Sequence, residues 1–171
     1  MSVTKIDFST LSLRDALDLA ILIEEEAEER YEELANQMEI HHRPEAAAFF
    51  RAMVANEMKH GEQLATRRTA LFQNAPRGVT RAMLWDVEAP DYDEVRANMT
   101  QRQALEVALR AEQKAHAFFV ATIPEVRDAE VRALFEHLRD EEIEHERMVN
   151  TELARLPEEP ELDVEDEPVA Q

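Results

Sequence analysis

The chain of 171 residues has no cysteine and only two glycines. The lack of cysteine excludes disulfides, zinc sites built from thiolates and iron–sulfur clusters held by cysteine. Aromatic residues make up 6% of the sequence, and this scarcity, together with so few glycines, favours helices over strands. No apolar run reaches the roughly 20 residues of a membrane-spanning helix, and Met1–Thr10 has no signal-peptide pattern. We therefore expect a helical, cytoplasmic protein that does not enter a membrane.

Basic residues are scarce relative to acidic ones, since 19 lysines and arginines face 38 aspartates and glutamates. The formal net charge of −19 argues against binding to nucleic acid or to an anionic membrane surface. Part of this charge is local, because Pro157–Gln171 holds seven acids and no base. The length predicts one domain, so we expect a folded domain over residues 1–156 and a disordered acidic tail over residues 157–171.

Four segments have the periodicity and the end signals of helices. Ser12 is a candidate N-cap with Asp15 in the first turn, and Thr100 with Gln103 forms a capping box. Prolines can open or end the other segments. The predicted helices run from Ser12 to about Gln37–His42, from Pro44 to about Phe72, from Thr100 to Pro124 and from about Arg127 to Leu156.

The lengths of the connections predict how these helices are arranged. Only a few residues join the first helix to the second and the third to the fourth, so each pair should form an antiparallel hairpin. Between the hairpins lie about 26 residues, Asn74–Met99, which extend to ~85 Å, whereas a helix of about 30 residues is about 45 Å long. This crossover can return along the whole bundle. The sequence thus predicts an all-α, ferritin-like antiparallel four-helix bundle with one long crossover between helices 2 and 3.

Each predicted helix has an apolar stripe with steps of three and four residues, as on the inward face of a bundle helix. One glutamate near the middle of each stripe interrupts it, and in the second and fourth helices a histidine follows three residues later. Because neighbouring helices are antiparallel, these positions should meet in one layer. A third Glu-x-x-His pair, Glu39 and His42, lies off the stripe. The expected layer comprises Glu24, Glu57, His60, Glu112, Glu142 and His145.

Four buried carboxylates need compensation, because an unpaired buried charge costs several kcal/mol and the four would repel one another. Two divalent ions would balance their four negative charges. The two imidazoles would add one neutral nitrogen ligand for each ion and leave coordination positions free for oxygen species. Such a mixed site suits iron or manganese. One glutamate from each of two helices and Glu-x-x-His from each of the others is the pattern of di-iron carboxylate proteins.

Over about residues 12–156 the chain resembles the rubrerythrin branch of the ferritin-like superfamily. The resemblance implies a non-haem centre of two iron ions, with manganese or zinc as substitutes. It also implies that Glu57 and Glu142 bridge the ions, with Glu24 and His60 completing one and Glu112 and His145 the other. The segments that carry it are EEEAEERYEELA (Glu24–Ala35), NEMKH (Asn56–His60), RAEQKAHAFF (Arg110–Phe119) and RDEEIEHE (Arg139–Glu146).

The reaction that the resemblance implies is oxidation of a diferrous centre by O2 or hydrogen peroxide, giving a diferric centre and water. Two residues are candidates for support of the ligands. Tyr31 would either hydrogen-bond to a ligand or pack in the stripe with its hydroxyl satisfied elsewhere. His116, four residues after Glu112, would either flank the metals or lie as an ordinary histidine at the helix interface.

The chain departs from the family pattern in two ways. Many rubrerythrins carry a rubredoxin module with cysteine ligands that supplies electrons, but this chain has no cysteine and would need an unidentified external electron donor. Rubrerythrins proper also place an additional glutamate one turn after the third-helix ligand, where this chain has Ala115. Since that glutamate has been linked to a preference for peroxide, the choice between O2 and peroxide stays open here.

Two other functions share parts of this pattern. One is iron storage or iron delivery of the ferritin type, and the other is a structural or interaction bundle without enzymatic activity. A homodimer is expected, whereas iron storage of the ferritin type would suggest a larger cage. Outside the layer, Gly61 would permit a close helix approach, form a small bulge or be a tolerated irregularity. Arg67 and Glu152, each ten residues past a layer position, would form a terminal salt bridge or face solvent.

Overall fold

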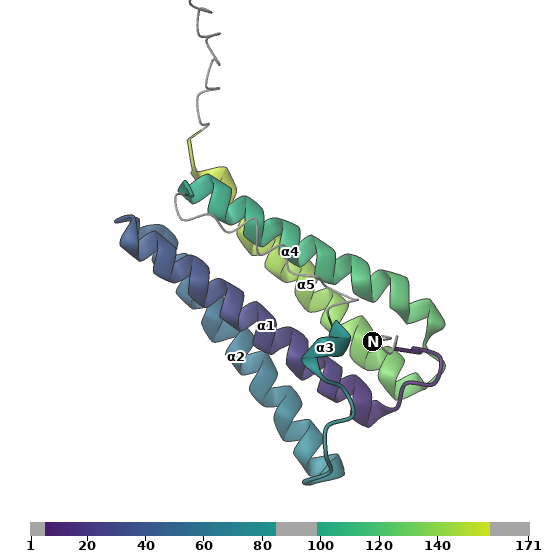
Figure 1. Cartoon of the computed structure of the whole chain (residues 1–171). Helices are drawn as coiled ribbons and strands as arrows, with labels where there is room; N and C mark the ends of the chain where they lie inside the picture. The colour runs from purple at the N-terminus through teal and green to yellow at the C-terminus, as the bar shows by residue number, and fades with distance from the viewer. Residues whose placement is uncertain (1–5, 85–98, 158–171) are drawn as a thin grey trace, which may run out of the picture.

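The computed structural model of the protein describes residues 6–84 and 99–157, and within them it is helical without strands (Figure 1). The acidic tail predicted after residue 156 therefore lies almost entirely outside the described residues, as does most of the crossover. None of the described helices is long and apolar enough to span a membrane. The helices are α1 (Leu13–Ile40), α2 (Pro44–Phe72), α3 (Arg81–Leu84), α4 (Gln101–Thr122), the 3-10 turn Ile123–Glu125 and α5 (Ala129–Arg155).

The predicted N-caps of α1 and α4 are confirmed. The Ser12 hydroxyl accepts a hydrogen bond from the Asp15 N–H at 3.2 Å. At α4, Thr100 Oγ1 accepts from the Gln103 N–H at 3.2 Å, and Gln103 Oε1 accepts from the Thr100 N–H at 3.0 Å, which completes the capping box. These bonds satisfy N–H groups that have no partner within the helix.

The fourth long helix begins two residues later than predicted. Asp128 caps α5, because its Oδ1 accepts from the N–H groups of Glu130 at 2.8 Å and Val131 at 3.0 Å. The ends of α1 and α2 lie where they were expected, although no glycine stands there. Instead His42 and Gln73, just past the two helices, have φ values of 56° and 51°, and this left-handed backbone stops helical propagation.

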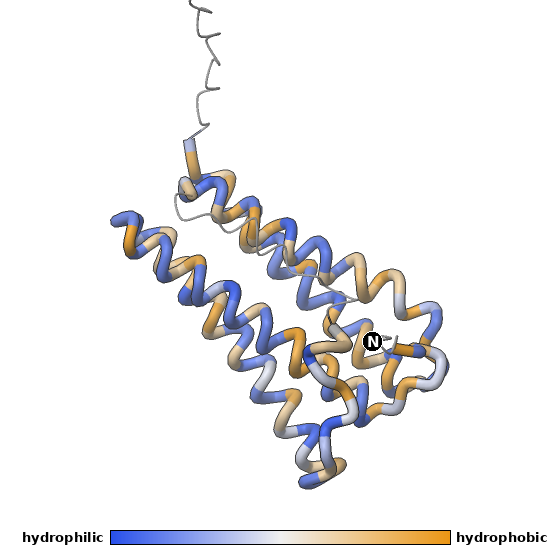
Figure 2. The backbone as a smooth tube through the Cα atoms, in the orientation of Figure 1, coloured by the Kyte–Doolittle hydropathy of each residue, from blue (hydrophilic) through white to orange (hydrophobic). Residues whose placement is uncertain are grey.

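The four long helices form two antiparallel hairpins, α1 with α2 and α4 with α5, which lie side by side (Figure 1). The end of α2 and the start of α4 lie at opposite ends of the bundle (Figure 1), so the ferritin-like topology is confirmed. The one described helix of the connection between them, the four-residue α3, was not predicted. Apolar and polar residues alternate along all four helices (Figure 2), as expected for helices with one inward face.

The core consists of two apolar clusters, one toward each end of the bundle. The first joins the N-terminal half of α1 to the end of α4 and the start of α5, and includes Leu17, Phe119 and Phe135. The second joins the C-terminal half of α1 to the starts of α2 and α4, and includes Tyr31 and Phe50. In each long helix the residues between the two clusters include the glutamate that interrupts the stripe.

The buried face of α2 differs from the predicted stripe near its end. Arg68, not Arg67, is the buried position, and Leu71 is exposed. An α-helix drifts ~20° per heptad from a strict 3.5-residue repeat, so eleven residues past Glu57 the inward position has moved on by one. Arg67 is exposed, which agrees with the expectation that it faces solvent. Glu152 forms an ion pair with Arg155 at 2.8 Å in the last turn of α5.

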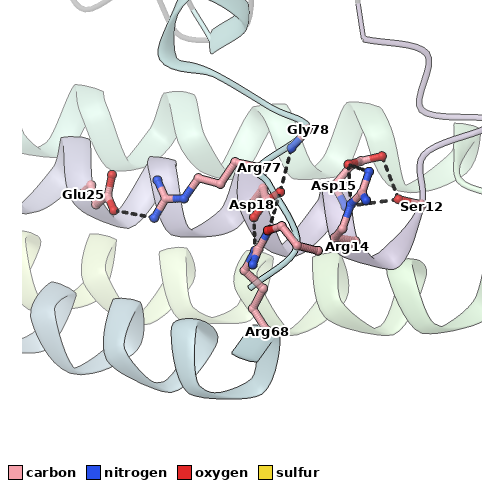
Figure 3. Close-up of polar contacts among 9 residues, drawn as sticks. Ser12, Arg14, Asp15, Asp18, Glu25, Arg68, Arg77 and Gly78 are labelled. Carbon is pink, nitrogen blue, oxygen red and sulfur yellow. Dashed lines mark hydrogen bonds and ion pairs between the residues drawn. The ribbon is translucent and has the colours of Figure 1, made fainter. Parts of the chain in front are cut away.

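A buried ion pair that the sequence did not predict joins α1, α2 and the start of the crossover (Figure 3). Asp18 accepts hydrogen bonds from the Arg68 guanidinium, through Nε to Oδ1 and through Nη2 to Oδ2 at 3.3 Å. Asp18 Oδ2 also accepts from the Gly78 N–H at 3.0 Å, and Arg68 Nη2 donates to the Ala75 carbonyl at 2.8 Å. This pair therefore anchors the crossover where it leaves α2.

The crossover passes close to the first turns of α1 at Gly78. A Cβ at this position would lie 2.1 Å from Oδ1 of Asp15, far inside van der Waals contact. Asp15 cannot easily turn away, because its carboxylate accepts from the Ser12 hydroxyl at 2.7 Å and from Arg14 Nε at 3.3 Å (Figure 3). The absence of a side chain at Gly78 thus permits this approach.

Candidate metal centre

The six residues predicted to form one layer do lie together between the two apolar clusters. Each long helix contributes a glutamate, and α2 and α5 each add the histidine one turn later. All of them are buried except His60, which is half-buried. The members of this layer are Glu24 on α1, Glu57 and His60 on α2, Glu112 on α4, and Glu142 and His145 on α5.

The two imidazoles stack in the middle of the layer, with ring centroids 5.5 Å apart and planes inclined by 10°. His145 Nδ1 lies 3.3 Å from Glu57 Oε1, 3.3 Å from Glu112 Oε2 and 3.9 Å from Glu142 Oε2. The ring of His145 thus meets carboxylates from three helices.

His60 faces the other side of the layer. Its Nδ1 lies 3.8 Å from Glu24 Oε2 and 3.9 Å from Glu57 Oε2. Glu57 therefore directs one oxygen toward each imidazole, whereas Glu142 approaches His145 alone among the two histidines. Of the two carboxylates that the resemblance implies as bridges, Glu57 has the more central position.

One acid near the layer was missed by the sequence analysis. Glu141 Oε1 lies 3.5 Å from His60 Nε2, although Glu141 is not on the apolar stripe of α5. Only its position one residue before Glu142 and four after His137 could have drawn attention to it. Three groups of side chains have donor atoms within 4.8 Å of one another: Glu57 with His60 and His145, Glu24 with His60 and Glu141, and Glu112 with Glu142 and His145.

Two buried atoms of the layer that could bind a metal lack a hydrogen-bond partner within the described part of the chain. They are Glu57 Oε1 and His60 Nδ1. Leaving a buried polar atom unpaired costs about 1–3 kcal/mol, so such atoms call for an explanation. A cation between the carboxylates and imidazoles would supply the missing interaction. Carboxylate oxygens together with imidazole nitrogens suit iron or manganese, so the donor set fits a centre of this kind.

Without a cation, most of the carboxyl groups of the layer resist ionisation. Burial raises the pKa of Glu57 to about 11, and the neighbouring carboxyl of Glu24 adds to this rise. Burial also raises the pKa of Glu24 to about 7 and that of Glu142 well above its usual value. Burial acts on Glu112 too, but hydrogen bonds with His145 and Glu142 outweigh it, and its pKa is lowered. The layer therefore holds protons that metal ions would displace.

The pKa values of the two histidines are shifted in opposite directions. Burial lowers the pKa of His60. Burial acts in the same direction on His145, but the hydrogen bond and the negative charge of Glu112 outweigh it, so the pKa of His145 is raised. The pair of His145 with Glu112 is thus the most strongly ionic contact of the layer.

The two candidate supporting residues have different surroundings. The Tyr31 hydroxyl, fully buried, donates a hydrogen bond to Glu112 Oε1. Burial and the charge of Glu112 raise the pKa of Tyr31 well above its usual value, so the hydroxyl keeps its proton. His116 instead lies outside the layer, with Nδ1 2.9 Å from Glu146 Oε1 on α5. This contact matches the expectation of an interface histidine.

A cavity of about 10 Å³ borders the carboxylates between α1 and α4, which is room for about one small molecule such as water. Its apolar wall includes Ala27, Ala111 and Ala115. Ala115 is buried there, so the position that carries an additional glutamate in rubrerythrins proper offers no ligand oxygen in this protein. The four glutamates of the layer and Arg30 form its polar wall.

Comparison with known proteins agrees with this architecture. The chain is similar to an uncharacterized conserved protein from Magnetospirillum magnetotacticum MS-1, known from a crystal structure, at 29% identity and a TM-score of 0.71. The similarity covers 88% of this chain and 99% of that one. Among curated proteins none matches the sequence. The model of the rubrerythrin family matches residues 15–153, most of the chain, and the protein therefore belongs to the rubrerythrin family.

Proposed function

We propose that this protein is a non-haem di-iron oxidoreductase, a ferroxidase or peroxidase whose oxidant is O2 or hydrogen peroxide. The observation that carries the proposal is the layer itself. Four buried carboxylates and two imidazoles converge there, and two of their atoms find no hydrogen-bond partner among the residues that the structure describes. A bundle with a purely structural role would gain nothing from this arrangement, because buried unpaired acids destabilise a fold. Membership of a family that binds di-iron centres supports the same conclusion.

The residues that would hold the two ions follow from the contacts of the imidazoles. Glu24 and His60 would serve one ion, and Glu112 and His145 the other. Glu57, with one oxygen toward each imidazole, would be shared. Glu142, beside His145, would be the second shared carboxylate. Manganese or zinc could occupy the same donor set.

Bound iron would supply the redox chemistry, namely electron transfer from a diferrous centre to the oxidant. The chain itself contributes orientation and exclusion of water. The two apolar clusters close the layer from both ends, and Tyr31 holds its proton against Glu112 Oε1, which orients that carboxylate. The cavity beside Ala115 leaves a space of about the size of one water molecule against the carboxylates. Because the sequence has no cysteine, repeated turnover as a peroxidase would need an external electron donor to restore the diferrous state.

The test of this proposal is metal content together with oxidant consumption. Protein purified without chelators should contain two metal ions per chain, and the iron(II)-loaded protein should consume O2 or peroxide. Glu57→Ala should lose most of the bound metal, because Glu57 would contact both ions. Glu39→Ala is the matched control, since Glu39 belongs to the exposed Glu-x-x-His pair outside the layer. Two ions per chain in Glu57→Ala would contradict the assignment, and bound metal without oxidant consumption would favour iron storage or delivery.

A further inference from the structure

Glu141 connects the buried layer to the protein surface. Its Oε1 lies 3.5 Å from His60 Nε2, inside the layer, and also 3.5 Å from Nε2 of His137, one helical turn earlier on α5. Neither Glu141 nor His137 is among the six proposed ligands. One carboxylate oxygen thus stands between an imidazole of the layer and an imidazole on the outer face of α5.

The exposure of these side chains falls stepwise toward the layer. The exposed fraction is 67% for His137, 20% for Glu141 and 18% for His60. It is 6% for the Glu24 side chain and 2% for that of Glu57, which both lie near His60. An ion arriving from solvent would therefore meet His137 first, Glu141 and His60 next, and the buried carboxylates of the layer last.

The chemistry of these side chains suits a divalent ion at every step. Glu141 also belongs to one of the groups whose donor atoms lie within 4.8 Å of one another, together with Glu24 and His60. Each group along this line offers a carboxylate oxygen or an imidazole nitrogen, the donors that iron(II) and manganese(II) accept. A negative carboxylate at the mouth of a site also raises the local concentration of cations and their rate of entry.

We propose that His137 and Glu141 form an outer site that captures a divalent iron or manganese ion and passes it to His60. This route rests on the proposed metal centre, because it has no purpose without a buried destination. Glu141 acts there as a transient ligand and not as a permanent member of the centre. This role explains why Glu141, which is not on the apolar stripe of α5, lies against His60. An ordinary surface ion pair would not need to contact a residue of the layer.

The experiment measures the uptake of iron(II) by metal-free full-length protein under anaerobic conditions, with a chromogenic iron(II) chelator ending uptake at successive times. Glu141→Gln should lower the initial rate of uptake at least about fivefold, because it removes the negative charge that attracts cations. His137→Gln should lower the rate by a similar factor, because it removes an imidazole ligand. Both variants should still reach two ions per chain. Glu136→Gln, which removes a charge from an exposed position on the same helix, is the matched control and should load at the wild-type rate.

Salt provides a second readout. Added salt should slow wild-type uptake and affect Glu141→Gln less, because exposed charges are screened.

Two results would overturn the route. One is a wild-type rate of uptake in both Glu141→Gln and His137→Gln. The other is loss of a tightly bound ion in Glu141→Gln, which would make Glu141 a ligand of the centre. If wild-type protein takes up no tightly bound ion, the proposed centre itself fails, and this result is distinct from a centre that loads without the outer site.

Discussion

Tyr31 illustrates, at the scale of the residue, how a side chain without ligand atoms for a metal controls the layer. Its hydroxyl donates a hydrogen bond to Glu112 Oε1, and the other oxygen of that carboxylate, Oε2, lies 3.3 Å from His145 Nδ1. The high pKa of the buried phenol keeps the proton in place. Tyr31 also packs in the second apolar cluster. It therefore packs in the stripe while its hydroxyl bonds to a glutamate of the layer, and not to a partner elsewhere.

We expect Tyr31→Phe to weaken metal binding about 10- to 100-fold, the usual cost of losing a partner that orients a ligand. The ring would still fill its place in the cluster, so the helix content should not change. Competition titration of manganese(II) against a chelator of known affinity measures the effect, with circular dichroism as the check of folding. An unchanged affinity would mean that the hydrogen bond to Glu112 does not orient a ligand.

The stability of the metal-free protein should fall as the pH rises from 5 to 8. Burial raises the folded-state pKa of Glu24 to about 7 and that of Glu57 to about 11, from 4.5, and Glu142 shifts in the same direction. The folded protein thus keeps protons that the unfolded chain releases above pH 4.5. Each such acid lowers the unfolding free energy by about 1.4 kcal/mol per pH unit until the pH reaches its folded-state pKa, near 7 for Glu24. His145, whose pKa is raised, acts in the same sense, whereas His60, whose pKa is lowered, opposes it.

Thermal unfolding of the chelator-treated protein at pH 5, 6, 7 and 8 measures this dependence. Glu57→Gln places a neutral amide where the folded protein holds a proton, so its melting temperature should vary less with pH. A wild-type melting temperature that stays level or rises over this range would contradict the protonation assigned to the layer.

At the scale of the element, the two glycines of the chain have opposite roles. Gly61 lies within the continuous helix α2, where a Cβ would meet Glu24 Cβ at 3.6 Å, an ordinary contact. There is no bulge, and the approach of α1 does not require the glycine, so Gly61 is a tolerated irregularity. Gly78 lies where a Cβ would collide with Asp15.

Gly61→Ala should therefore raise the unfolding free energy by about 1 kcal/mol, the cost of glycine in a helix interior, and the melting temperature by about 2–4 °C. Gly78→Ala should instead lower the unfolding free energy by about 1–3 kcal/mol through overpacking. Thermal and urea unfolding of both variants checks the contrast. The same sign of change in both variants would contradict it.

The Asp18–Arg68 pair joins α1, α2 and the start of the crossover. Removing one partner should therefore destabilise the fold more than removing both. Arg68→Met leaves the Asp18 carboxylate buried without its cation, which should cost about 3–5 kcal/mol of unfolding free energy. Removing both charges in Asp18→Leu/Arg68→Met should cost less than the single change. Arg147→Met, which breaks the exposed pair with Glu144, is the control and should cost under about 1 kcal/mol.

Urea unfolding of these variants and of the single variant Asp18→Leu provides the comparison. The double-mutant cycle of the wild type, both single variants and the double variant separates the coupling of the pair from the contacts of each partner. If the double variant is at least as unstable as Arg68→Met, the pair is not coupled in this way. Its cost would then lie in the lost hydrogen bonds to Gly78 and Ala75.

At the scale of the whole molecule, the layer divides the core in two. The apolar clusters stabilise the bundle on either side, whereas the layer between them carries acids that must be protonated or neutralised. Bound metal would neutralise these acids and link all four helices through their side chains, so that the layer would stabilise the bundle. The homodimer predicted from the sequence stays a prediction, which sedimentation can test.

Anaerobic iron(II), or manganese(II), should raise the melting temperature of the metal-free protein, because ions that bind only the folded state stabilise it by mass action. At a free ion concentration 100 times the dissociation constant, the gain is about 2.7 kcal/mol, or about 5–10 °C for a chain of this length. Glu57→Ala should show little of this shift. An unchanged melting temperature of the wild type at saturating metal would count against a buried site.

The local features of this protein could be predicted from the sequence. Helix ends follow from caps and prolines within a few residues, as at Ser12, Pro44 and Thr100. The convergence of the four glutamates and two histidines also follows, because an antiparallel bundle places the middle of each helix at the same height. The family could also be inferred, but from the resemblance of the segments that hold these residues and not from periodicity, which determines only which side chains share a face.

Other features depend on the distance between helices, which periodicity does not contain. Asp18 and Arg68 are ordinary charged residues in their own helices, and only packing against the crossover buries them together. Glu141 lies one position off the stripe, so its approach to His60 depends on how α5 is rotated against α2. The surroundings of Tyr31 and His116 were likewise decided by the tertiary structure, because a hydrogen bond needs a partner at the right distance and angle, and in both cases that partner comes from another helix.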